Sequence, residues 1–113
     1  MGAVTEPATS AVADTVDAAP SGSIYDCAAY ILQRFETPVS TMKLQKLLYL
    51  AQGWSLAITG RPLFDAEFEA WPSGPVNREI FELLKGEYTV DPESFAAKLQ
   101  LLAASQSTMA PNA

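Results

Sequence analysis

The sequence predicts a mainly α-helical fold, a compact helical domain of about four helices around a central apolar helix. Apolar residues recur at helical spacing in several segments, and each segment has its own start and stop signals. One of them, residues 41–59, is apolar on nearly every side, as in a helix that is buried by its neighbours. Alternation of apolar with polar or small residues is found around Phe68–Trp71, so we expect a short β-strand or hairpin near 66–72.

The folding unit is expected at residues 23–105. Residues 1–22 are rich in Ala, Thr, Ser, Pro and Val, with three acidic residues and no basic residue. Such a stretch cannot bury enough apolar surface to offset the entropy lost on ordering, so we predict a disordered tail. Residues 106–113 are likewise predicted to be a disordered C-terminus.

The first helix is predicted to run from Ser23, its cap, to about Phe35. Its apolar positions follow helical spacing: Ile24, Cys27, Ile31 and Phe35. The helix should end before Pro38, because a residue that precedes proline avoids the α region.

The second helix is expected to be the central post of the domain, with Ser40 or Thr41 as its cap and Gly60 as its stop. Gly53 lies inside it at a cost of about 1 kcal/mol relative to alanine, and we expect another backbone to pass close by. The polar margin of the helix is narrow: Lys43, Gln45, Lys46 and Gln52. The predicted core consists of apolar residues of this helix and the next: Leu44, Leu47, Leu48, Ala51, Trp54, Ile58, Ile80 and Leu84.

Two further helices follow a Pro-Ser-Gly-Pro turn at 72–75. Pro75 suits the first position of the third helix, with Ser73 or Gly74 as the cap and Gly86 as the stop. In the fourth helix Asp91 is the expected cap and Pro92 the first residue. Its inward residues are predicted to be Phe95, Leu99 and Leu102, with Leu101 as a further candidate.

The composition argues against catalysis. There is no histidine and one cysteine, so ordinary zinc spacing and the usual nucleophile–histidine sites cannot be built. No glycine-rich nucleotide motif is present. Carboxylate pairs such as Glu67 with Glu69 are interpreted as solvated faces. Cys27 is interpreted as a small core residue. We therefore predict that the chain is no enzyme and has no catalytic residue, no metal site and no cofactor.

Charge and hydropathy limit the partners. The net charge is −6 and no basic stripe is present, which disfavours nucleic-acid binding. No apolar run approaches the ~20 residues that a membrane-spanning helix needs, and no secretory signal is recognisable. A cytoplasmic protein that binds another protein is the resulting expectation.

Three stretches together resemble the Panacea domain of SocA-like and GepA-like, phage-associated bacterial proteins. They are residues 43–54 (KLQKLLYLAQGW), 60–64 (GRPLF) and 68–76 (FEAWPSGPV). The resemblance implies an antitoxin that neutralises a cognate toxin by direct protein contact. The alternative that it implies is an adaptor that delivers the toxin to a ClpXP-type protease. A DNA-binding regulator is the less favoured third option.

The partner-binding residues are expected around the Pro-Ser-Gly-Pro turn and the polar margin of the second helix. Trp71 either packs in the core or is an exposed aromatic anchor of the type found at binding hot spots. Members of the family usually continue through a second half, without which apolar surface of the central helix would need a toxin, a second copy of the chain or another protein to cover it. The candidate contact residues are Lys43, Gln45, Lys46, Tyr49, Trp71, Ser73, Gly74 and Pro75.

Overall fold

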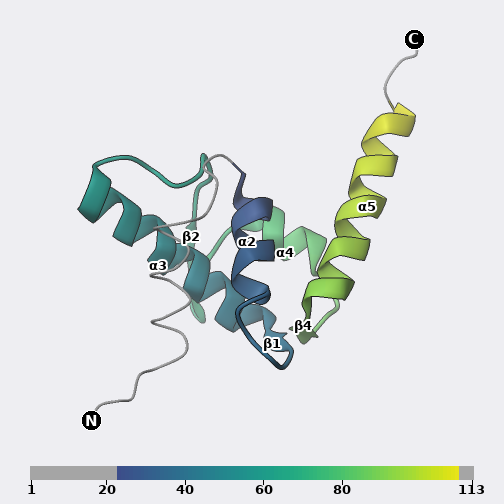
Figure 1. Cartoon of the computed structure of the whole chain (residues 1–113), viewed down its shortest axis with the longest axis horizontal. Helices are drawn as coiled ribbons and strands as arrows, with labels where there is room; N and C mark the ends of the chain where they lie inside the picture. The colour runs from purple at the N-terminus through teal and green to yellow at the C-terminus, as the bar shows by residue number, and fades with distance from the viewer. Residues whose placement is uncertain (1–22, 110–113) are drawn as a thin grey trace.

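A computed structural model describes residues 23–109 of the chain, and both the predicted N-terminal tail and residues 110–113 lie outside this range. In chain order the described elements are α2 (Ile24–Leu32), β1 (Val39–Ser40), α3 (Thr41–Thr59), β2 (Glu69–Trp71), β3 (Gly74–Val76), α4 (Arg78–Leu83), β4 (Thr89–Val90) and α5 (Pro92–Met109). The mainly α class with a short hairpin is confirmed (Figure 1).

Helix α2 is capped as its sequence predicts but ends earlier. The Ser23 hydroxyl accepts a hydrogen bond from the backbone N–H of Tyr25 at 3.0 Å. The helix stops at Leu32, because the chain tightens into a turn in which the N–H of Phe35 donates to the carbonyl of Leu32. Phe35 therefore packs against the core from a turn rather than from the last helical turn.

Helix α3 has the predicted ends. The Ser40 hydroxyl accepts from the N–H of Lys43, and Gly60 takes the left-handed conformation at φ 76°. Strand β1 pairs antiparallel with β4, so Val39 lies opposite Val90. This short ladder joins the start of α3 to the start of α5, which are far apart in the sequence.

The β2–β3 hairpin corrects the predicted start of the third helix. Pro75 is in β3, opposite Ala70, and not at the first position of a helix. Helix α4 begins at Arg78, and its cap is Asn77, whose Oδ1 accepts from the N–H of Ile80 at 2.9 Å. Proline has no backbone N–H, so it is tolerated both at the first position of a helix and at a strand position whose N–H would not take part in pairing. The sequence therefore allows either place for Pro75, and the pairing of β2 with β3 decides for the strand.

Helix α5 begins as predicted, with the Asp91 carboxylate accepting from the N–H of Ser94 at 2.8 Å. Leu101 of this helix is 71% exposed and so does not face inward. The helix continues past the predicted domain boundary at Ser105 to Met109. Its C-terminal half extends away from the other elements (Figure 1).

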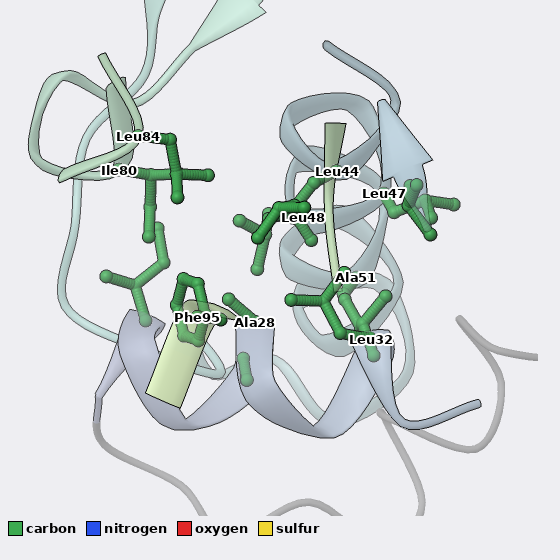
Figure 2. Packing of buried hydrophobic residues seen from close by; sticks show 14 of the residues in the cluster. Ala28, Leu32, Leu44, Leu47, Leu48, Ala51, Ile80, Leu84 and Phe95 are labelled. Atoms are coloured by element: carbon green, nitrogen blue, oxygen red, sulfur yellow. The ribbon is translucent and has the colours of Figure 1, made fainter. Parts of the chain in front are cut away.

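The core lies where α2, the first half of α3, α4 and the start of α5 meet. Figure 2 shows Phe95 of α5 beside Ala28 of α2, with side chains of α3 and α4 converging on them. Six of the predicted core residues are buried: Leu44, Leu47, Leu48, Ala51, Ile80 and Leu84. Cys27 is also fully buried, as expected of a small core residue.

The two other predicted core residues, Trp54 and Ile58, are exposed by 43% and 60%. The inner face of α3 ends with Ala51 and Ser55. Trp54 and Ile58 follow the buried Leu47 and Ala51 by seven residues, so they continue the same side of the helix, but beyond the part that the other elements cover. A Cβ built on Gly53 meets no atom within 4 Å, so the expected close backbone is absent from the described residues.

None of the helices in the range 23–109 is both long and apolar enough to cross a membrane.

Candidate protein interaction surface

A buried glutamine fixes the hairpin to α3. The Gln45 side chain donates to the carbonyl of Asn77 at 3.1 Å and accepts from the N–H of Asn77 at 2.8 Å. Gln45 is only 3% exposed. The prediction that Gln45 contacts a partner is therefore wrong, because both ends of its amide are occupied inside the domain. Its role is to hold the β3–α4 junction against α3.

A second glutamine of α3 holds the loop that leads to the hairpin. The Oε1 atom of Gln52 accepts from the N–H groups of Leu63 and Phe64, and its Nε2 donates to the Phe64 carbonyl at 2.9 Å. Phe64 is thereby buried, and Phe68 lies next to it with ring centroids 6.2 Å apart. The sequence predicts that both glutamines lie on the solvent-exposed side of the helix. In the structure each one instead forms hydrogen bonds to backbone groups of a segment farther along the chain.

Between α3 and the hairpin lies a hollow of about 300 Å³, and four of the predicted contact residues line it: Tyr49, Trp71, Gly74 and Pro75. The other lining residues are Phe68, Glu69 and Ala70. Tyr49 and Phe68 form one wall as an edge-to-face pair, with centroids 5.4 Å apart. Phe68 was not among the predicted contacts, although its place in the alternating segment before Trp71 is the signal that could have revealed it.

Trp71 is half-buried and held in one orientation. Its ring packs edge-on against Phe81, with centroids 4.9 Å apart, and the Arg78 guanidinium lies 5.3 Å from the ring centroid. Its Nε1–H donates to Glu69 at 2.8 Å, and Arg78 also binds Glu69 at 3.0 Å. Trp71 is thus neither a core residue nor a free side chain, but a partly exposed aromatic residue that contacts within the domain hold in place.

The same contacts determine the protonation state of Glu69, which lines the hollow. The hydrogen bond from Arg78, and after it that from Trp71, lowers the pKa of the Glu69 carboxyl below its ordinary value. Glu69 therefore stays ionised and paired at neutral pH. Glu69 is thus ion-paired with Arg78 and Glu67 is exposed, as expected of a solvated face and not of a proton-sharing dyad.

The remaining predicted contact residues lie at the border of the hollow or outside its lining. The Lys46 Cε is 3.6 Å from the position that a Cβ on Gly74 would take, so Lys46 borders the turn. Ser73 is exposed in that turn. Lys43 is exposed, and its ammonium lies 5.0 Å from the ring centroid of Phe35.

The apolar surface continues along α3. Tyr49 and Phe68 also belong to a groove of about 580 Å³ on the outward face of the helix. Of the charged residues within 23–109, none lines this groove. Its remaining lining residues all come from the second half of α3: Leu50, Gln52, Gly53, Trp54, Leu56, Ala57 and Ile58.

The reactive groups of the described region are few. Burial raises the pKa of the Cys27 thiol to about 12, so the nucleophilic thiolate is suppressed at neutral pH. Among residues 23–109, no three potential metal ligands come together. The arrangement at the hollow is suited to contact with apolar and aromatic groups.

Comparison with known sequences identifies the domain. The family model described as antitoxin SocA-like, Panacea domain, matches residues 44–108, which is more than half of the chain. The chain belongs to the SocA-like Panacea family. The matched segment contains most of α3, the hairpin, α4 and nearly all of α5. The Panacea match thus includes every residue that lines the hollow, and the resemblance seen in the sequence is confirmed.

A curated Panacea relative is antitoxin SocA of Caulobacter vibrioides (strain NA1000 / CB15N). It is 48% identical over 46 residues, which are 41% of this chain and 24% of the relative. The matched part of the chain therefore spans about a quarter of the length of that relative. No solved structure matches this Panacea chain.

Proposed function

We propose that this Panacea domain neutralises a cognate toxin protein by binding it directly at the hollow between α3 and the β2–β3 hairpin. The observation that carries the proposal is the ordered aromatic lining of that hollow, with Tyr49 against Phe68 on one side and Trp71 on the other. Aromatic residues that are held in place lose little entropy on binding and are enriched at hot spots of protein interfaces.

The surroundings of the hollow favour a protein as the ligand. Its centre is apolar and aromatic, whereas Lys46 and the Glu69–Arg78 ion pair lie at its border. An apolar centre with a charged rim is the usual anatomy of a protein interface.

DNA binding is disfavoured by the same region. Helix α4, the candidate recognition helix, has six residues. Its Arg78 is bound to Glu69 at 3.0 Å and lies 4.0 Å from Glu82, so its charge is already compensated. A recognition helix needs free cations along a phosphate-lined groove.

The proposal is tested by co-expression with the product of the neighbouring gene, provided that this product arrests growth when expressed alone. The wild-type chain should restore growth and should bind the toxin in calorimetry. Trp71→Ala should weaken binding by about 30-fold, as expected for a hot-spot residue. Tyr88→Ala is the matched control, because Tyr88 is an aromatic residue that is 83% exposed and does not line the hollow.

Because Trp71 also packs on Phe81, the thermal midpoint of Trp71→Ala must be measured beside its affinity. Tyr49→Ala gives a second test. Tyr49 is a half-exposed residue of α3, and its substitution removes the wall of the hollow that lies opposite Trp71. Wild-type affinity and full rescue in both variants would show that the toxin binds elsewhere or is not bound.

A further inference from the structure

The outward face of the second half of α3 has no covering element within residues 23–109. Its five large apolar side chains are between 43% and 60% exposed: Tyr49, Leu50, Trp54, Leu56 and Ile58. Isolated exposed apolar residues are common on proteins, but a contiguous group along one helix usually marks an interaction site.

The arrangement of small and large side chains on this face suits packing against a second helix. At 3.6 residues per turn, Leu50, Gly53 and Ala57 lie along one line parallel to the helix axis. The larger side chains flank that line, Tyr49 and Leu56 on one side and Trp54 and Ile58 on the other. A Cβ on Gly53 would meet no atom within 4 Å, so another backbone has open access at this point. Small residues between ridges of large ones let two helices pack closely.

The charge pattern is compatible with a second copy of this chain as the partner. No charged residue occurs from Leu47 to Gly60, and no charged residue within 23–109 lines the groove. In a two-fold symmetric contact, a residue near the axis faces its own copy, so a charge there would repel itself. A face that is free of charge can pair with itself without this penalty, although the whole chain carries a net charge of −6.

The size of the face also suits a dimer. At the exposures given above, its five large side chains present on the order of 500 Å² to solvent. A stable interface of standard size buries roughly 800 Å² on each partner. Phe68, Ala57 and the polar margin of the groove lie beside these side chains and can supply the difference.

We propose that the second half of α3 is a homodimer interface, in which the α3 helices of two copies of this chain cross at Gly53. Leu50, Gly53, Trp54 and Ala57 form its centre. These four residues do not line the hollow that we assign to the toxin, whereas Tyr49 and Phe68 border both surfaces, so dimerisation and toxin affinity are measured separately in every variant.

The test is sedimentation velocity of the full chain at concentrations of about 1 to 100 µM, because interfaces of standard size have dissociation constants from micromolar downward. The wild type should approach twice its chain mass of 12.1 kDa as its concentration rises. Gly53→Leu should remain a monomer over this range, because the added side chain blocks the crossing point, while its Cβ meets no atom of residues 23–109 within 4 Å. Ala97→Leu, at an exposed position of α5, is the matched control and should dimerise like the wild type.

Two further measurements complete the test. Circular dichroism of Gly53→Leu should show unchanged helix content, which separates a lost interface from a lost fold. Added salt should leave the wild-type dimer unchanged or strengthen it, because screening weakens the repulsion between two chains of charge −6. A wild type that stays monomeric overturns the proposal, and so does a dimer that survives Gly53→Leu. If the wild type is monomeric and Gly53→Leu lowers toxin affinity, the face belongs to the toxin instead.

Discussion

The two halves of α3 differ in burial although both are apolar. Leu44 and Leu48 in the first half are fully buried, whereas Leu50 and Leu56 are each 47% exposed. Figure 1 shows α2 crossing the first part of the helix, while the end of α3 extends past it. Burial along this helix is thus set by which elements lie against it and not by the hydrophobicity of its residues. The buried half holds the domain together, and the exposed half remains available for partners.

The largest effect that tests this contrast comes from a pair of identical substitutions. Leu48→Ala should lower the free energy of unfolding by about 2–5 kcal/mol, because it leaves a cavity in the packed core. Leu50→Ala, two positions away on the outward side, should cost less than about 1 kcal/mol. Urea unfolding, at a protein concentration low enough to exclude association, measures both. Equal losses in the two variants would show that the second half of α3 is buried as well.

A smaller effect is expected from Gln45, the polar residue on the buried half. Gln45→Ala removes both hydrogen bonds to Asn77 and leaves its buried N–H and carbonyl without partners. This should cost about 1–3 kcal/mol. Gln100→Ala, at an exposed position of α5, makes the same chemical change and should stay within about 0.5 kcal/mol of the wild type. The thermal midpoints of the two variants report the difference, and a neutral Gln45→Ala would contradict the tie between α3 and the hairpin.

The smallest effect concerns pH at the surface beside the exposed half. The pKa of Glu69 in the folded protein is lower than its ordinary value of 4.5. The contribution of Glu69 to stability is therefore complete above pH 4.5 and is lost as the pH falls through the folded pKa. Glu69→Gln should lie slightly below the wild type in stability at pH 7 and should converge with it in acid. Parallel pH profiles for the two proteins would mean that the Arg78 pair does not contribute.

The contact residues show how far a sequence leads toward a site. Tyr49, Trp71, Gly74 and Pro75 were predicted from the motif segments, and they do line one hollow. Gln45 was misplaced because a polar residue in a helix is ordinarily assigned to water, and its partner Asn77 is 32 positions away in the chain. Phe68 and the Arg78–Glu69 pair around Trp71 were missed, since only folding of the hairpin against α3 and α4 brings them together.

The sequence by itself determined the local features of this protein. Ser23, Ser40, Gly60 and Asp91 define helix ends through hydrogen bonds or dihedral angles within a few residues, so their roles could be read from the chain. Only the tertiary structure decided that Pro75 belongs to a strand, that Gln45 is buried and that Trp54 is exposed. Each of these depends on which distant segments pack together. The hydrophobic effect is non-directional, so it favours the burial of apolar surface against any segment, wherever that segment lies in the sequence.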